Sequence, residues 1–228
     1  MEGIKAEKVT DTLTVLQKKG VFSYGTDAVM LADYVLENVK FINGKKTCDL
    51  CSGTGIIPLI LCDKNPQLRA ACVEISEKAA DLCKKSVKLN GFEDRIDVLC
   101  ADIKDVKKLF ENEEFDFVTC NPPYMTAKCG KMCDDEDINI ARHEISCDIY
   151  DVFRAAFHLL KTGGCIYTVY RSDRLSALMN AAKQNKFEIK DIVFIKTKKT
   201  SDECGIFTCK AMKNASEGMK VSVKSINE

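Results

Sequence analysis

The chain has 228 residues, 46% of them hydrophobic, and equal numbers of basic and acidic side chains give a formal net charge of zero. This composition fits one globular α/β domain, excludes wholesale disorder, and weakly disfavours a nucleic-acid binder, although the distribution of charge matters more than its sum. No apolar run approaches the ~18 residues that cross a bilayer, and the N-terminus has no apolar signal segment. We therefore expect a soluble, cytoplasmic protein with no membrane partner.

Strand-like and helix-like segments alternate along the first half of the chain. Apolar residues share one helical face in a segment that Thr26 or Asp27 is predicted to cap: Ala28, Leu31, Ala32 and Val35. Strands are then predicted at Thr47–Cys51, Leu68–Val73, Arg95–Cys100 and Phe115–Cys120. The helices between them are predicted at Ile56–Asp63, from the cap Ser76 to the stop Asn90-Gly91, and at Ile103–Glu111.

The second half continues the alternation after a long connection. A loop of about 25 residues runs to Ser146, far longer than ordinary strand–helix loops, and such loops are usually functional or disordered. A helix around Phe153 to Leu160 is predicted to stop at Gly163-Gly164, and a strand at Cys165–Tyr170 follows. Ser172 is the predicted cap of the next helix. The last predicted strands are Ile189–Lys196 and Gly205–Met212.

This order of elements predicts an α/β fold with helices on both faces of a mostly parallel sheet. We expect seven strands, with an antiparallel strand closing the sheet because the last strands follow one another across a turn. Residues 1–40 are predicted to form an N-terminal extension whose helix packs near the site, and residues 41–228 the main domain. We favour a monomer.

Polar residues recur where the predicted strands end. Asp49 begins Asp49-Leu50-Cys51-Ser52-Gly53-Thr54-Gly55 after the first strand, and the later strands end at Glu74, Asp102 and Asn121. Ligands of doubly wound sheets bind at the carboxyl ends of the strands, and an acid about 20 residues past a glycine turn accepts hydrogen bonds from ribose hydroxyls. The glycine segment lacks the G-x-G-x-x-G spacing of NAD-binding folds.

The Asp-x-x-x-Gly-x-Gly segment resembles the first motif of class I S-adenosylmethionine-dependent methyltransferases, a Rossmann-like family. The resemblance implies that Gly53 and Gly55 line the methionine part of S-adenosylmethionine and that Asp49 faces its amino group, directly or through water. It also implies that Glu74 holds the ribose, and that Asp102 with Ile103 contacts the adenine. The family more often has glycine where Cys51 stands.

Asn121-Pro122-Pro123-Tyr124 matches the catalytic loop of methyltransferases that act on planar exocyclic or amide nitrogens. Such a nitrogen is a poor nucleophile because its lone pair is delocalised. The Asn121 side-chain oxygen and the Pro122 carbonyl can accept its two hydrogens, while the prolines keep that carbonyl rigid. Tyr124 offers a face on which an extruded base can stack.

Three stretches resemble the tRNA(Val) adenine N6-methyltransferase family: residues 22–32, the segment 49–59, and Ala141-Arg142-His143-Glu144. The resemblance implies a tRNA partner, methylation of an adenine near the anticodon, and positions close to the cofactor for Gly25, Thr26, Asp27 and Asn121. Arg142 and His143 would face the substrate, although Arg142 could instead pair with nearby acids and His143 could be a surface residue.

Other functions use the same elements. One is methylation of a glutamine amide of a protein, and another is methylation of guanine N2 in ribosomal RNA. A non-catalytic scaffold with this fold is a third alternative, which the intact Asn121 loop and cofactor acids argue against.

Thirteen cysteines are many for this length. The odd count and the lack of a secretion signal argue against a disulfide framework, and cysteines in apolar strands behave as small hydrophobes. We predict no structural metal. Cys48 and Cys51 have zinc-like spacing, but a strand directs residues three apart to opposite faces. Cys129 and Cys133, in the long loop, are the one exception left open.

Overall fold

The computed structural model describes residues 3–21, 23–39, 44–123, 147–196 and 203–225. Their main element is an eight-stranded sheet with the strand order β10-β8-β9-β7-β6-β3-β4-β5. Its strands are β3 (Lys46–Leu50), β4 (Arg69–Glu74), β5 (Ile96–Cys100), β6 (Phe115–Cys120), β7 (Leu160–Arg171), β8 (Phe187–Lys196), β9 (Ile206–Lys213) and β10 (Lys220–Ser225). All neighbours pair in parallel except β9, which is antiparallel to both β7 and β8. The predicted α/β class and mostly parallel sheet are confirmed.

Two details of the predicted sheet need correction. It has an eighth strand, β10, whose apolar residues Val221 and Val223 are each 58% exposed, so its alternation does not mark a buried face. The antiparallel strand β9 lies between β7 and β8 instead of closing the edge. The helix α7 (Leu175–Gln184) connects β7 to β8, which runs parallel to β7 and leaves space for one strand between them. The next strand, β9, fills that space and is antiparallel to both neighbours.

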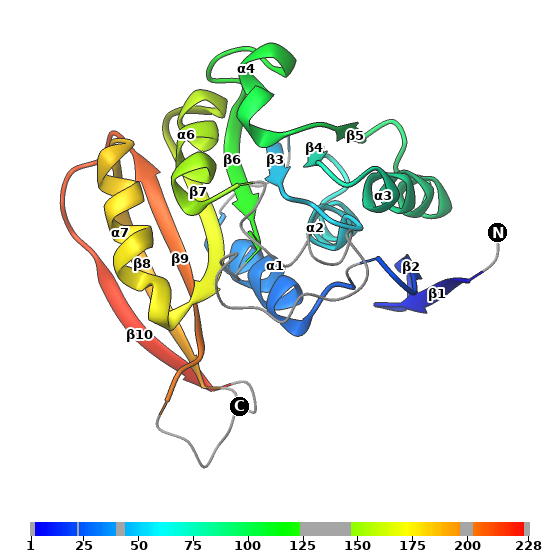
Figure 1. The fold of residues 1–228 in the computed structure, drawn as a ribbon, viewed down its shortest axis with the longest axis horizontal. Helices are drawn as coiled ribbons and strands as arrows, with labels where there is room; N and C mark the ends of the chain where they lie inside the picture. The colour runs from blue at the N-terminus through cyan, green and yellow to red at the C-terminus, as the bar shows by residue number, and fades with distance from the viewer. Residues whose placement is uncertain (1–2, 22, 40–43, 124–146, 197–202, 226–228) are drawn as a thin grey trace.

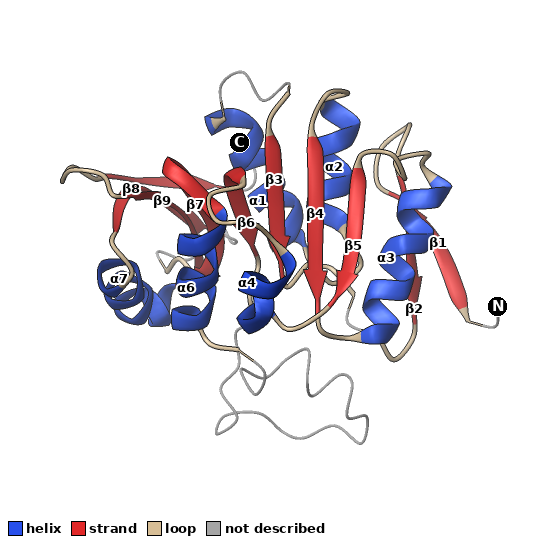
Figure 2. Ribbon diagram, turned by 90° about the horizontal axis from the view of Figure 1, so that it is seen from above, coloured by secondary structure: helices blue, strands red, loops and turns tan. Residues whose placement is uncertain are grey.

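Helices cover both faces of the sheet, as predicted. One buried cluster contains residues of α1 (Thr26–Asn38), α2 (Ile56–Lys64) and α3 (Glu77–Leu89), and the other contains residues of α4 (Val106–Leu109), α6 (Ile149–Leu159) and α7. Within β4, Ala70 and Cys72 belong to the first cluster and Ala71 and Val73 to the second, which is the period of two that a strand imposes. Figure 2 shows α1 and α2 on one side of the strands and α4 and α6 on the other.

The predicted helix boundaries hold at α3 and, to within one residue, at α2 (Ile56–Lys64), whereas the caps predicted for α1 and α7 and the end predicted for α6 are wrong. Ser76 caps α3 by accepting a hydrogen bond from Ala79 N at 3.4 Å. The cap of α1 is Gly25 instead of Thr26 or Asp27, and Ser172 heads the short 3₁₀ turn η2 (Ser172–Arg174) without capping α7.

The glycine pair predicted to stop α6 lies inside β7, and the helix already ends at Leu159. Gly164 has a role in the sheet instead. A Cβ on Gly164 would lie 3.0 Å from the carbonyl oxygen of Asp116, so this position needs glycine for close approach to the neighbouring strand.

An antiparallel pair, β1 (Ile4–Lys8) and β2 (Thr14–Lys18), precedes α1 and packs on α3. Thr14 and Asn90 exchange two hydrogen bonds, from Thr14 N to Asn90 Oδ1 at 3.0 Å and from Asn90 Nδ2 to Thr14 O at 2.7 Å. Leu16 N donates to Ser86 Oγ at 2.9 Å. The division at residue 40 stays a prediction. No helix among the described residues combines the length and apolarity that crossing a membrane needs.

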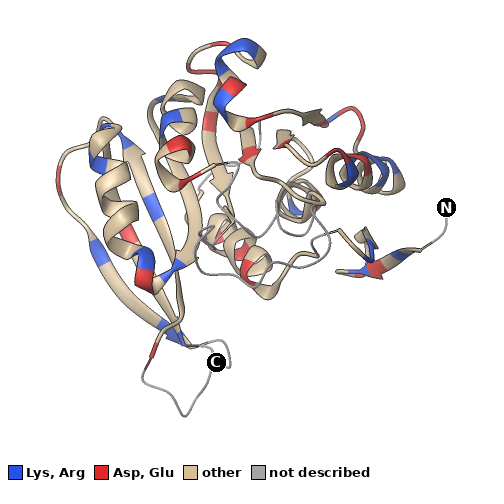
Figure 3. Ribbon diagram, in the orientation of Figure 1, with Lys and Arg blue, Asp and Glu red and all other residues tan. Residues whose placement is uncertain are grey.

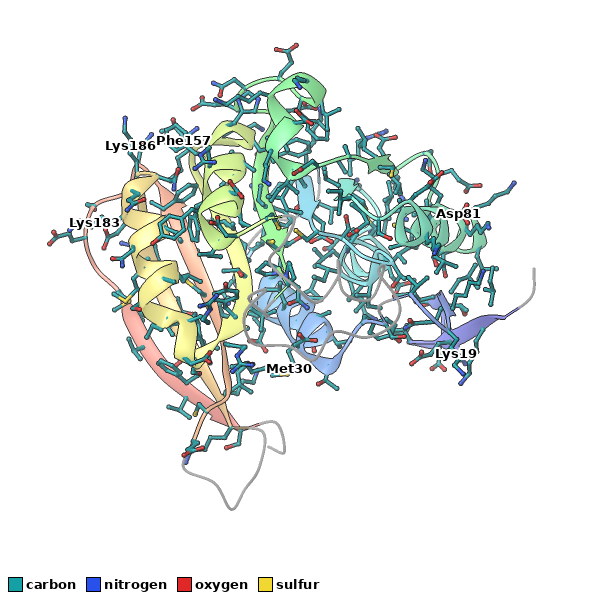
Figure 4. All side chains as sticks on the ribbon, in the orientation of Figure 1. Lys19, Met30, Asp81, Phe157, Lys183 and Lys186 are labelled. Carbon is teal, nitrogen blue, oxygen red and sulfur yellow. The ribbon has the colours of Figure 1, made fainter. Side chains whose placement is uncertain are left out.

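Lys213 is a buried cation that links the end of β9 to the C-terminal end of α6. Its side chain is 2% exposed, and Nζ donates to Glu113 Oε1 at 2.9 Å and to the carbonyls of Phe157 and Leu160 at 2.7 Å each. The Lys213 ammonium also lies 4.3 Å from the centre of the Phe157 ring. Figure 4 labels Phe157, with Lys186 close to it. These contacts replace the water that Lys213 loses.

We expect Lys213→Met to lower the free energy of unfolding by about 2–4 kcal/mol, because it leaves two carbonyls without a donor in a largely buried setting. Urea denaturation measures this. The matched control is Lys224→Met, which removes an ion pair between Lys224 and Glu37, 61% and 57% exposed, and should cost less than about 1 kcal/mol. Equal small losses in the two variants would contradict a structural role for Lys213.

Candidate functional site

The carboxyl ends of β3, β4, β5 and β6 meet along one edge of the sheet. Because the strands are parallel and in register, Leu50 lies opposite Cys120 and Glu74 lies opposite Cys100. The sequence-predicted residues Asp49, Glu74, Asp102 and Asn121 therefore lie at or next to the ends of four adjacent strands, as Figure 1 lets the reader follow. This is the edge where ligands of parallel sheets bind.

The loop between β3 and α2 takes a left-handed backbone three times. The φ angles are 57° at Cys51, 55° at Gly53 and 82° at Gly55. A Cβ on Gly55 would collide with the Cys83 sulfur, whereas one on Gly53 would meet no described residue within 4 Å. Gly55 is thus required for packing on α3, while Gly53 leaves open space on its Cβ side. The left-handed φ at Cys51 accounts for the glycine that the resembling family prefers there.

Asp49 is a buried carboxyl with one acceptor left over. It is 1% exposed, and Thr119 Oγ1 donates to its Oδ1 at 2.6 Å, while Oδ2 is buried and has no hydrogen-bond partner among the described residues. Burial raises the pKa of Asp49 to about 7, with a further rise from the Glu74 charge and an opposing effect of the Thr119 hydrogen bond. In the unfolded chain the pKa is about 3.9, so the stability that this group contributes is present below that pH and lost as the pH rises through about 7.

Glu74 holds the glycine loop in place. Its Oε2 accepts from Gly53 N and its Oε1 from Ser76 N, both at 2.8 Å. Burial raises the pKa of Glu74, and the backbone N–H donors counteract part of this rise. Each carboxylate oxygen has two lone pairs, so Glu74 can accept further hydrogen bonds from a ligand.

Asp102 and Ile103 follow β5 and differ in exposure. The Asp102 side chain accepts from Lys104 N at 2.9 Å and caps the 3₁₀ turn η1 (Ile103–Asp105). The Ile103 side chain is 4% exposed and lies in the core with α6. A ligand at this edge could therefore meet Asp102 through its side chain and Ile103 mainly through its backbone.

Asn121 directly follows β6 and meets the start of α1. Its Nδ2 donates to Asp27 Oδ2 at 3.2 Å, although the two residues are 94 positions apart. Pro122 is buried and Pro123 half-buried. Thr26 and Gly25 are exposed beside Asp27 at the N-terminus of the helix. Tyr124, Arg142, His143, Cys129 and Cys133 lie outside the described residues.

Two residues that shape this edge are not marked by the sequence patterns. Thr119 lies opposite Asp49 in the β3–β6 register, at a position where the pattern predicts only a residue of an apolar strand. Ser52 is buried, and its Oγ donates to Asp49 O and Val73 O at 3.1 Å each, which joins β3 to β4. The pattern that could have revealed them is a hydroxyl residue beside each strand-end acid.

Three thiols also gather under the edge. Cys51 Sγ lies 3.7 Å from Cys147 Sγ, and the buried Cys120 precedes Asn121. The Cys51 thiol has its pKa raised by its hydrogen bond to Cys120 and by burial, against a lowering by Cys147. Within the described ranges no group of three His, Cys, Asp or Glu residues is arranged to hold a metal ion. The expected lack of a structural metal stays a prediction.

The residues at this edge fit S-adenosylmethionine. The ligand's ammonium needs an anion nearby, directly or through water, and the ionised Asp49 carboxylate can supply one, since its Oδ2 has no partner in the part of the chain that the structure describes. Its ribose hydroxyls need acceptors such as Glu74 at a neighbouring strand end. The open side of Gly53 leaves room for the methionine part.

Known proteins with similar sequences are methyltransferases. The model of the family described as the methyltransferase small domain matches residues 12–189. A tRNA1(Val) (adenine(37)-N6)-methyltransferase from Porphyromonas gingivalis is 31% identical over 156 residues, which are 68% of this chain and 60% of that protein. A release factor glutamine methyltransferase from Clostridium acetobutylicum is 30% identical over 177 residues, 75% of this chain and 62% of that protein. The chain thus spans less than two thirds of the length of either relative.

Solved structures show the same fold at low sequence identity. A predicted O-methyltransferase from Agrobacterium tumefaciens superposes with a TM-score of 0.69 at 20% identity, covering 89% of each chain. The Thermus thermophilus 16S rRNA N2 G1207 methyltransferase, in complex with AdoMet and guanosine, gives 0.62 at 18% identity over 92% of this chain and 50% of its own.

The fold and the sequence similarities indicate the same family, and membership of that family identifies the cofactor. The chain belongs to the methyltransferase small domain family and has the Rossmann-like fold of class I methyltransferases, whose cofactor is S-adenosylmethionine.

Proposed function

We propose that this chain transfers a methyl group from S-adenosylmethionine to the exocyclic N6 amine of an adenine in tRNA. The observation that carries the proposal is the position of Asn121 and Pro122 at the end of β6, on the same sheet edge as the buried carboxyl of Asp49 and the half-buried carboxyl of Glu74. An acceptor for amine hydrogens thus adjoins the acids suited to the cofactor.

The proposed cofactor contacts follow from the side chains at this edge. Asp49 accepts from the ammonium group, directly or through water, and Glu74 accepts from the ribose hydroxyls while it still fixes Gly53. Gly53 and Gly55 line the methionine part, and Asp102 with Ile103 borders the adenine. Gly25, Thr26 and Asp27 at the N-terminus of α1 complete the wall of the site. When bound, S-adenosylmethionine supplies an electrophilic methyl group on a sulfonium.

The proposed task of Asn121 and Pro122 is to make a poor nucleophile reactive. The Asn121 side-chain oxygen and the Pro122 carbonyl accept the two N–H hydrogens of the amine, which favours a pyramidal nitrogen with its lone pair directed at the methyl group. Burial of Pro122 and the fixed φ of two successive prolines keep this acceptor pair rigid. The methylated nitrogen is cationic and loses a proton readily, so no base with a shifted pKa is needed.

Support for adenine in tRNA comes from the relatives. The Porphyromonas gingivalis relative carries that activity in its name, as does one from Bacteroides thetaiotaomicron that is 28% identical over 174 residues. An adenine in an anticodon loop is unpaired, so turning it into a pocket costs less than it would in a duplex. Tyr124, Arg142 and His143 are the proposed substrate contacts and lie outside the described residues.

A second candidate is methylation of a protein glutamine amide, another planar nitrogen. The Clostridium acetobutylicum relative matches 75% of this chain, as much as the Bacteroides thetaiotaomicron relative and more than the Porphyromonas gingivalis one. Basic and acidic residues are interspersed on the same elements, for example on α3 and α6 (Figure 3), and a phosphate backbone prefers a basic surface. A tritium-methyl transfer assay on total tRNA, ribosomal RNA and a release-factor preparation separates the candidates. Label in tRNA as N6-methyladenosine supports the proposal, and label confined to protein or ribosomal RNA overturns it.

We expect Asn121→Ala to lower kcat by at least about 100-fold, because it removes a hydrogen bond that is strongest in the transition state. The dissociation constant of S-adenosylmethionine should change less than about threefold, since the ligand's ammonium and ribose are held elsewhere. Single-turnover kinetics and calorimetry measure the two quantities. A large loss of cofactor affinity with kcat unchanged would assign Asn121 to the cofactor instead of the amine.

The affinity for S-adenosylmethionine should depend on pH through Asp49. Burial raises the pKa of this carboxyl to about 7, and only its ionised form attracts the ammonium group. We therefore expect affinity to rise about eightfold between about pH 6 and pH 7.5, with release of a proton on binding. Asp49→Asn keeps an oxygen for the Thr119 hydroxyl and should bind more weakly, with no such rise. Calorimetry in buffers of different ionisation enthalpy tests this, and identical pH profiles for the two proteins would rule out Asp49 as the titrating group.

A further inference from the structure

The contact between Asp27 and Asn121 joins the first turn of α1 to the proposed catalytic loop. Asp27 Oδ2 accepts from Asn121 Nδ2 at 3.2 Å, and Asp27 Oδ1 accepts from Ala28 N at 2.9 Å. The carboxylate is therefore held through one oxygen by the backbone of its own helix, and it presents the other oxygen to the loop. An acid in the first turn is also favoured by the helix dipole.

An asparagine amide has two ends of nearly the same shape and opposite hydrogen-bonding character. Its NH₂ group only donates and its oxygen only accepts, so a flip by 180° exchanges the two roles. A carboxylate can only accept. Facing Asp27, the Asn121 amide is satisfied with Nδ2 toward the carboxylate, whereas the flipped amide would bring two acceptors together.

We propose that Asp27 is a positioning residue that fixes the orientation of the Asn121 amide, so that its oxygen faces the amine to be methylated. The inference rests on the proposed function and deepens it, because a flipped Asn121 would offer N–H groups to an amine whose own hydrogens need acceptors. It differs from the role implied by the family resemblance, in which Asp27 lies close to the cofactor.

Gly25 provides an independent reason to assign this role. It caps α1 in an extended conformation, and a Cβ there would lie 2.5 Å from Asp27 Oδ1. Since the obstructed atom is the end of a side chain, Gly25→Ala should displace the Asp27 carboxylate and leave the helix in place. The glycine therefore keeps the carboxylate within reach of Asn121.

A double-mutant cycle on kcat tests the coupling. Asp27→Ala should lower kcat roughly 10- to 100-fold, the size expected for a hydrogen bond to a charged group. Asp27→Asn can face either end of the Asn121 amide and should lower kcat only about 2- to 10-fold. Gly25→Ala should act in the same direction as Asp27→Ala. In an Asn121→Ala background all three changes should have almost no further effect on kcat.

The matched control is Asp33→Asn, which removes a carboxylate from the same helix six positions away and should leave kcat unchanged. Calorimetry with S-adenosylmethionine separates the two roles of Asp27. Positioning predicts a change in the dissociation constant below about threefold. A rise of tenfold or more with kcat intact at saturating cofactor, or equal losses of kcat with and without Asn121, would overturn the proposal.

A readout without any methyl acceptor keeps this test apart from the proposed function. In nitrogen-15 spectra, the side-chain NH₂ signal that Asn121→Ala removes should shift and exchange faster with water in Asp27→Ala, but not in Asp33→Asn. That result with no label in any RNA would refute the proposed substrate and leave the Asp27 contact standing. An unaltered signal in Asp27→Ala would refute the contact itself, whatever the substrate.

Discussion

The parallel pairing of β3 with β4 on one side and β6 on the other is the constraint on which the site depends. Parallel strands in register end together, so residues separated by tens of positions in the chain meet at one edge. The pairing brings Asp49, Glu74 and Asn121 together although they belong to different segments of the sequence and share no local motif. The helices on the two faces bury the strands and leave this edge for the site.

The edge carries an electrostatic cost that the proposed ligand removes. Asp49 and Glu74 are acids largely removed from water, and burial raises the pKa of both. Glu74 is compensated by backbone donors, whereas the described residues give Asp49 a single hydroxyl donor and leave its other oxygen without a partner. A buried acceptor without a donor destabilises a fold unless a ligand supplies one, and such groups cluster at functional sites. The buried Asp49 carboxyl thus lowers the stability of the ligand-free fold and provides an acceptor for the ammonium group of the proposed ligand.

Residue patterns predicted the parallel core of the fold and the acids at its edge, because strand alternation, glycine turns and strand-end acids are local signals. They did not predict that β9 inserts between β7 and β8, since sequence order does not determine position in a sheet, or that β10 forms an edge strand with exposed valines. Of the two glycines expected to stop α6, Gly164 instead allows close packing of β7 on β6. The contact of Asp27 with Asn121 spans 94 positions and depends on how α1 docks, which no local pattern encodes.

In the proposed site, one edge of the sheet holds the methyl donor beside an acceptor pair formed by Asn121 and Pro122. The decisive measurement is a crystal structure with an anticodon stem-loop and an unreactive analogue of S-adenosylmethionine. We expect the analogue's amino group near Asp49, its ribose on Glu74, and an extruded adenine whose N6 lies about 3 Å from Asn121 Oδ1 and Pro122 O. A cofactor analogue bound away from this edge, or an adenine whose N6 meets neither acceptor, would refute the proposed arrangement.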